Sequence, residues 1–144
     1  MDDRLEFLRK RACDAMIALA ENRWVDADEA FHPHATWWII GQGELAHSRV
    51  RQLATETEGQ LSKHGLRVMG TVAEGNKVAV ELRGEMEFPD GRTYRNTYHH
   101  VVEFEGDRII RLHEYFDTFY VRQVFGEDLY ERKIDADAAA KQPV

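Results

Sequence analysis

The sequence predicts an α+β fold in which helices from the first half of the chain cover one face of a mostly antiparallel sheet from the second half. Before residue 65, apolar residues recur at three- and four-residue spacing, which is typical of helices that bury one side. From Leu66 onward the spacing changes to two, which is typical of strands. Short turns that contain glycine separate these strands, and strands joined by such turns run antiparallel.

Two helices are expected at the start of the chain. Residues 3–22 carry an apolar stripe at helical spacing, and Asp2 or Asp3 stands where the N-terminal cap belongs. A short second helix is expected to begin near Asp26. There, Asp26-x-x-Glu29 has the spacing of a capping box, with Asp in place of Ser or Thr.

A strand and a third helix are expected next. Residues 35–40 are rich in β-branched and aromatic side chains, which favour a strand, and Gly41 and Gly43 interrupt the chain after it. Residues 44–64 carry a sparse apolar face and predict a third helix. Gly65 then stands where a C-terminal cap is expected, because glycine readily adopts the left-handed conformation found at helix ends.

Long strands are expected to fill most of the second half. Their turns are marked by Glu-Gly-Asn, Pro-Asp-Gly and Glu-Gly-Asp sequences. The strands are expected at residues 68–74, 77–88, 93–104 and 108–121. We expect residues 1–134 to form a single domain and residues 135–144 to form a flexible tail.

Composition limits the classes of function. The chain has 144 residues, with 19 Lys and Arg against 26 Asp and Glu, and its net charge of −7 argues against partners such as nucleic acid or an anionic membrane. The longest apolar run, residues 15–20, is too short for a membrane-spanning helix, which needs about 20 residues. Cys13 is the only cysteine, so an intramolecular disulfide is impossible, and we expect a reducing, cytoplasmic location.

Three segments of the chain carry a family resemblance. They read FHPHATWWIIGQGELAHSRV, VAVELRGEMEFPDGRTYRNTYHHVVEFEGDRI and IIRLHEYFDT. Through them, the chain resembles the SnoaL-like branch of the nuclear transport factor 2-like superfamily, which also contains ketosteroid isomerase, limonene epoxide hydrolase and polyketide cyclases. The resemblance implies a cone-shaped fold, in which a strongly curved sheet wraps around three N-terminal helices and encloses a deep pocket. It also implies a homodimer through the outer sheet face, with an apolar patch of Val78, Val80, Leu82 and Val101.

Glu114 is the first candidate for chemistry. It shares a strand face with Leu112 and Phe116, and it matches the position of one of the two catalytic acids of limonene epoxide hydrolase. In that enzyme, two acids flank an Arg and together activate water against an epoxide. Glu81 and Arg83 match the positions of that Arg and the second acid, so the same groups occur here in swapped order. The alternative for these residues is a structural ion pair or a solvated strand face.

The orientation of the strand that carries Glu81 and Arg83 has two interpretations. Alternation alone turns Val78, Val80 and Leu82 towards the core, and Glu81 and Arg83 towards solvent. The resemblance implies the reverse, with Glu81 and Arg83 in the pocket and the apolar side chains in a dimer interface. We follow the resemblance on this point.

Neighbouring side chains on the preceding strand complete the catalytic candidates. His100 matches the oxyanion-hole Asp of ketosteroid isomerase, where a neutral His would donate a hydrogen bond or move a proton. Tyr98 and Asn96 share its strand face and would orient a carbonyl or a water molecule. The alternatives are a His satisfied by a carboxylate and polar side chains that only support the sheet.

Apolar residues are expected to line the rest of the pocket. Trp38 matches a water-positioning Tyr of limonene epoxide hydrolase, but an indole has one donor and no acceptor and cannot hold water in the same way. Ile40 stands where that enzyme has Asn, so epoxide hydrolysis itself is in doubt. We expect Trp38, Phe116 and Leu112, together with Asn96, to contact a substrate or to fill the pocket themselves.

Ketosteroid isomerisation is excluded by the residues at its two key positions. The general-base Asp position falls at Ile39 or Ile40, and the oxyanion Tyr position falls near Ala15 or Met16. None of these side chains can exchange a proton with a substrate.

The histidine pairs do not predict a metal site. Adjacent His99 and His100 point to opposite faces of a strand and cannot share one ion. His32 and His34 lack the convergent ligands from other segments that zinc sites need. The sequence also lacks a P-loop and a G-x-G-x-x-G motif, so we expect neither a metal nor a cofactor.

These observations predict a cofactor-independent acid–base enzyme. Its substrate would be a small, apolar, oxygenated compound of polyketide, terpenoid or steroid type, and the reaction would be an isomerisation, cyclisation, dehydration or hydrolysis. The alternative is a non-catalytic ligand-binding or dimerisation domain with the same fold, because one fold supports many functions.

Overall fold

The structure is a computed structural model that describes residues 2–58 and 63–126. In chain order, its elements are α1 (Asp3–Ala20), α2 (Trp24–Ala30), β1 (Phe31–Ile39), β2 (Gly43–Ala46), α3 (His47–Glu58), β3 (Lys63–Glu74), β4 (Lys77–Glu87), β5 (Thr93–Glu105), β6 (Arg108–Phe116) and α4 (Thr118–Phe125). The expected tail, residues 135–144, lies outside the described residues.

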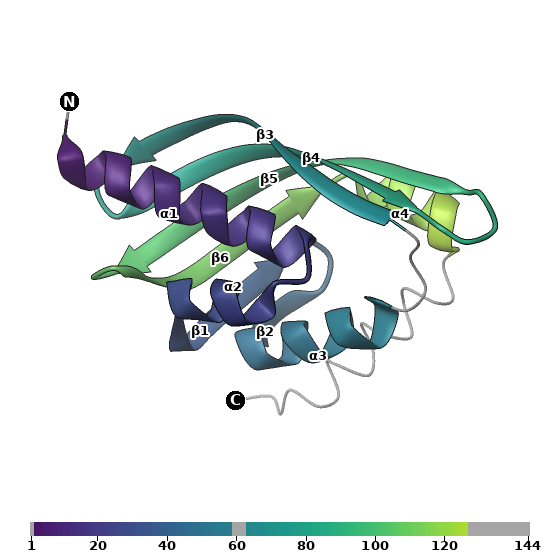
Figure 1. Ribbon diagram of the computed structural model, residues 1–144, viewed down its shortest axis with the longest axis horizontal. Coiled ribbons are helices and arrows are strands. Elements are labelled where there is room, and N and C mark those ends of the chain that lie inside the picture. Colours follow the sequence, from purple (N-terminus) through teal and green to yellow (C-terminus); the bar gives the residue numbers. More distant parts are fainter. Residues whose placement is uncertain (1, 59–62, 127–144) are drawn as a thin grey trace.

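The strands form one curved sheet in the order β2-β1-β6-β5-β4-β3. Every neighbouring pair is antiparallel except β1 and β6, which are parallel. Figure 1 shows the long strands curving over α1, with α2 and α3 on the same side of the sheet. Helix α1 packs against α2, β3 and β4, whereas α3 packs against β1 and β2. This arrangement confirms the predicted α+β fold.

Helix α1 agrees with its sequence pattern. The backbone N–H of Arg4 donates to Asp2 Oδ1 at 2.8 Å, so Asp2 is the N-terminal cap. The apolar stripe at helical spacing is buried and comprises Leu8, Ala12, Ala15, Met16 and Ala18. Its alanines allow the helix to lie close to the sheet and to α2.

The expected boundaries of the next two helices are wrong. Helix α2 begins at Trp24, and Asp26 forms an ion pair with Arg23 at 2.8 Å inside the first turn instead of capping the helix. Residues Gly43–Ala46 form strand β2, which pairs with β1, so the third helix begins only at His47. Gly65 is a residue of β3 opposite Glu85 and not a helix cap.

The last expected strand is too long, because the chain changes to a helix after Phe116. The carboxylate of Asp117 accepts the backbone N–H of Tyr120 at 3.1 Å and caps helix α4. Residues 118–121 were expected to continue the strand, but they form the first turn of this helix, with Val121 buried and Phe119 exposed. Val121 of this helix is buried in a second apolar cluster with Phe88 and Tyr94.

Burial decides the orientation of β4 and overturns the choice that followed the resemblance. Val78, Val80 and Leu82 are fully buried, whereas Glu81 and Arg83 are exposed on the outer face. The physical reason is that α1 and the other helices cover the inner face, where an unpaired carboxylate or guanidinium would lose its hydration. The expected dimer patch is therefore wrong in three of its members, and only Val101 lies on the outer face.

An aromatic cluster occupies the outer face near β1. The ring of Trp38 lies 5.4 Å from that of His113 and 5.1 Å from that of Tyr115. Trp38 therefore faces away from the helices, while its neighbour Trp37 is buried on the inner face. Within the described ranges, none of the helices combines the length and the hydropathy needed to cross a bilayer.

Candidate functional site

A cavity of about 290 Å³ lies between the inner face of the sheet and helices α1, α2 and α3. Its apolar lining comprises Met16, Leu19, Ala20, Trp24, Trp37, Val50, Ala54, Leu66 and Met86. Its polar side chains are Asn22, Tyr98, His100 and Glu114. Among the described residues that line it, none is Lys or Arg. An apolar hollow with a few polar groups is the usual form of a small-molecule site.

His100 and Glu114 form the acid–base pair of this cavity. They lie opposite each other on β5 and β6, and alternation turns both towards the helices. His100 Nε2 lies 3.6 Å from Glu114 Oε1, and the two side chains are only 8% and 16% exposed. This distance exceeds that of a direct hydrogen bond, and His100 Nε2 has no other partner. Nε2 itself is closed to water, so a ligand oxygen contacts both groups only if the side chains around them shift.

Met16 favours one position for the proton of the neutral His100 ring. His100 Nδ1 lies 2.9 Å from Met16 Sδ across 84 residues of sequence. A thioether is an acceptor and cannot donate, so the contact is favourable only when Nδ1 carries the proton. In the neutral ring, Nε2 then has a lone pair on the side of Glu114. With the proton on Nδ1, Nε2 is the nitrogen of the neutral ring that accepts a proton within the cavity.

Tyr98 adds a hydroxyl donor to the same wall. Burial, followed by the effect of neighbouring Tyr94, raises the pKa of Tyr98 well above its ordinary value, so the phenol keeps its proton. Its ring lies 6.0 Å from that of His100 in an edge-to-face arrangement. A Cβ atom on Gly84 would lie 2.8 Å from this ring, so glycine on β4 leaves the space that the ring occupies.

A hydrogen-bonded chain fixes the opposite wall. Trp37 Nε1 donates to His47 Nδ1 at 3.1 Å, and His47 Nε2 then carries the proton and donates to Asp28 Oδ1 at 2.8 Å. Arg51 forms an ion pair with the same carboxylate. The chain joins β1, α2 and α3, and it holds the Trp37 ring against the cavity.

The structure brings together three of the site residues predicted from the sequence, which are Glu114, His100 and Tyr98. Glu81 and Arg83 lie on the outer face, as does Trp38, so the expectation that they face the pocket is wrong. In each case alternation on the observed strand register turns the side chain away from the helices.

The remaining predicted residues lie outside the cavity lining. Asn96 is buried, where its Nδ2 donates to the carbonyl of Asp117 at 3.2 Å and its Oδ1 accepts from Thr97 N at 2.8 Å. Phe116 packs against the ring of Tyr98 at 5.8 Å, and Leu112 is a fully buried core residue. These side chains support the wall of the site instead of facing a ligand.

Sequence reasoning missed the apolar half of the site. Trp37 carries a usable signal in the sequence, because it alternates with the apolar residues Ala35 and Ile39. The structure buries these residues, and Trp37 with them, on one face of β1. Met16 carries a weaker one, because the oxyanion Tyr position of ketosteroid isomerase falls near Ala15 or Met16. Trp24 carries none, since its place in the cavity depends on how α2 packs on the sheet.

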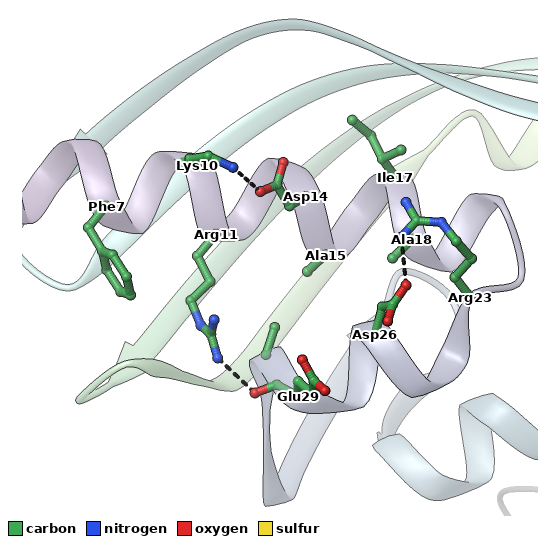
Figure 2. A pocket seen from close by; sticks show the side chains of 11 residues that line it. Phe7, Lys10, Arg11, Asp14, Ala15, Ile17, Ala18, Arg23, Asp26 and Glu29 are labelled. Carbon is green, nitrogen blue, oxygen red and sulfur yellow. Dashed lines mark hydrogen bonds and ion pairs between the residues drawn. The ribbon is translucent and has the colours of Figure 1, made fainter.

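A second hollow of about 440 Å³ lies outside the sheet between α1 and α2. Figure 2 shows that most of its charged side chains are engaged with one another or with the backbone. Lys10 pairs with Asp14, Arg23 pairs with Asp26, and Arg11 donates to the carbonyl of Glu29. The smaller inner cavity is therefore the better candidate. Across residues 2–58 and 63–126, no three His, Cys, Asp or Glu side chains gather as metal ligands.

Comparison with known proteins identifies the family. The family model of the SnoaL-like domain matches residues 11–112. The chain belongs to this family. No curated protein matches its sequence.

Solved structures of the nuclear transport factor 2-like superfamily share its fold. AclR, a putative hydroxylase from Streptomyces galilaeus, is 11% identical, with a TM-score of 0.74 over 85% of this chain and 97% of AclR. An LEH-like epoxide hydrolase from M. tuberculosis is 16% identical, with a TM-score of 0.69 over 86% of this chain and 99% of the hydrolase. TerC, crystallised with polyporic acid, is 16% identical, with a TM-score of 0.71 over 84% of this chain and 99% of TerC. Identities this low show a shared fold and no shared activity.

Proposed function

We propose that this SnoaL-like domain is a cofactor-independent enzyme that transfers a proton between its Glu114–His100 pair and a small, apolar, oxygenated substrate. The observation that carries the proposal is the 3.6 Å approach of His100 Nε2 to Glu114 Oε1 in an otherwise apolar cavity. General acid–base catalysis needs such a pair within reach of one reacting atom. Relatives with the same fold include a named epoxide hydrolase, which supports an enzymatic role.

Each polar side chain has a role in this proposal. The Glu114 carboxylate takes a proton from the substrate or from a water molecule that attacks it. His100 Nε2 accepts that proton from Glu114 and then returns it to a second substrate atom, so the pair ends the cycle as it began. The Tyr98 hydroxyl, which keeps its proton, exchanges its long 3.4 Å hydrogen bond to the Tyr94 hydroxyl for one to a developing oxyanion. Isomerisation, cyclisation, dehydration and hydrolysis all share this pattern of proton removal and return.

The charge and the size of the cavity restrict the class of compound that it would bind. The cavity carries a carboxylate, and none of its described lining residues is Lys or Arg, so a neutral ligand is favoured over a carboxylic acid. Its volume of about 290 Å³ is at the lower end for ligand pockets, which span about 300–1,000 Å³. A compound with a single ring, such as a small terpenoid or aromatic ketone, therefore suits the cavity better than a steroid.

The test compares variants on a panel of neutral single-ring ketones, epoxides and alcohols. Glu114→Gln keeps the shape of the side chain and removes the base, so turnover should fall at least about 100-fold. Glu81→Gln is the matched control on the exposed face and should leave turnover within about twofold. Unchanged turnover in Glu114→Gln would show that this carboxylate is not the base.

A non-catalytic ligand-binding domain is the second candidate function. The mainly apolar lining favours it, since such a lining is sufficient for binding. Saturable binding of a panel compound, without product and with equal affinity in wild type and Glu114→Gln, would support this function over catalysis.

We also propose a homodimer through the outer face of the sheet. Val72, Ala79, Val101, His113 and Trp38 lie side by side across β3, β4, β5, β6 and β1. Val72 is 71% exposed, and exposed apolar rows of this kind are typical of interfaces. Light scattering at micromolar concentration should give twice the mass of the chain, and a monomer would refute the proposal.

A further inference from the structure

Two buried nitrogens without hydrogen-bond partners belong to residues that line the cavity. They are His100 Nε2, already described, and Trp24 Nε1 at the start of α2. Trp24 is only 9% exposed, so bulk water does not compensate its N–H group. A buried donor without a partner costs free energy and calls for an explanation, such as an absent ligand.

The surroundings explain why no protein group meets this N–H. The ring of His47 lies 5.9 Å from that of Trp24, but both nitrogens of His47 are engaged, Nδ1 with Trp37 and Nε2 with Asp28. The two indoles of the cavity are therefore different. The N–H of Trp37 has a protein acceptor, whereas the N–H of Trp24 has none among the described residues.

We propose that the Trp24 side chain, whose Nε1 is closed to water in this structure, shifts when a ligand enters the cavity, so that Nε1 donates a hydrogen bond to a ligand oxygen and determines specificity. The ligand would then carry two oxygens, one that accepts from Trp24 on α2 and one that contacts His100 and Glu114 on the sheet. The oxygen at Trp24 belongs to a ketone, ester or ether, because a carboxylate finds no Lys or Arg among the described lining residues. This inference rests on the proposed function for the location of the site, but not for its catalysis.

The test uses Trp24→Phe, which keeps an aromatic ring and removes the N–H. The probes are para-hydroxyacetophenone, which has a carbonyl oxygen, and para-ethylphenol, which has a methylene group in its place. A neutral hydrogen bond contributes a factor of about 2 to 10 in affinity. Wild type should therefore bind the ketone more tightly by such a factor. In Trp24→Phe this preference should disappear, with the affinity for para-ethylphenol unchanged within about twofold.

The control variant is Trp38→Phe, which alters an indole on the outer face and should keep the preference for the ketone. A second readout is the indole ¹H–¹⁵N signal that Trp24→Phe removes from the spectrum. Both aromatic probes shift this signal through their ring currents, and the ketone should move it further downfield than para-ethylphenol because only the ketone accepts its hydrogen bond.

Equal preference in wild type and Trp24→Phe, or a Trp24 signal that the ketone moves no further downfield than para-ethylphenol does, would overturn the inference. If the Trp24 effect is absent while Glu114 remains essential for turnover, the inference alone fails. If the Trp24 effect is present and no compound turns over, the proposed catalysis alone fails.

Discussion

Replacing Met16 by leucine should change the tautomer of His100. Met16 is 1% exposed, and its sulfur lies 2.9 Å from His100 Nδ1. Leucine has a similar volume, so the packing change costs less than about 1.5 kcal/mol. It offers no acceptor, however, and a buried N–H left without a partner costs about 1–3 kcal/mol. The proton should therefore move to Nε2, which faces the Glu114 carboxylate at 3.6 Å.

The assay is ¹⁵N NMR of the histidine side chains at a pH where His100 is neutral. In wild type, Nδ1 should carry the proton and Nε2 should not, and Met16→Leu should reverse this pattern. The tautomer should also alter the pH dependence of any turnover, because Nε2 would donate to Glu114 instead of accepting from it. The titratable side chains that line the cavity within the described residues are Tyr98, His100 and Glu114.

Met86→Leu provides the matched control. Met86 lines the same cavity without contacting a His100 nitrogen, so its replacement should leave the tautomer unchanged. A wild-type His100 that already carries its proton on Nε2 would refute the role of Met16. The same conclusion would follow if Met16→Leu and Met86→Leu gave identical histidine spectra.

Two further predictions concern Tyr98. Gly84→Ala should destabilise the protein by about 1–3 kcal/mol in urea unfolding, because its Cβ would lie 2.8 Å from the buried Tyr98 ring. Gly70→Ala, which meets open space on β3, should cost much less, and equal losses would contradict the clash. Since burial raises the pKa of folded Tyr98, its contribution to stability is complete below the unfolded pKa of about 10 and is lost as the pH rises through the folded value. Tyr98→Phe should make the unfolding free energy fall less steeply above that pH. Tyr115→Phe, on the outer face, should leave the slope unchanged, and an unaltered slope in Tyr98→Phe would refute the shift.

The alternation of residues 78–83 was sufficient to orient β4 correctly, but the match to a distant relative pointed the other way. The local pattern was the better guide because burying Glu81 or Arg83 without a partner costs more than burying Val80 or Leu82. A match of positions between proteins of low identity carries less information about side-chain direction. One residue inserted before a strand turns each of its side chains to the opposite face of the sheet.

Non-local pairing explains the elements that sequence patterns misplaced. Gly43–Ala46 becomes a strand because β1 offers it a partner, although its own residues fit a helix. The parallel pairing of β1 with β6 shows an irregularity between Phe31 and Thr36, and this register turns Trp37 inward and Trp38 outward. Two adjacent tryptophans cannot be distinguished by composition, so only the register assigns one of them to the cavity.

The sequence by itself determined the α+β class, the capped first helix, the antiparallel order of the long strands and the shared strand face of Tyr98 and His100. All of these follow from local periodicity and from turns a few residues long. The tertiary structure alone decided that Met16 meets His100 across 84 residues and that Trp24 lines the same cavity with an N–H that no group in residues 2–58 and 63–126 accepts. Contacts of this kind depend on how helices pack over a curved sheet, and that packing is set by the whole core.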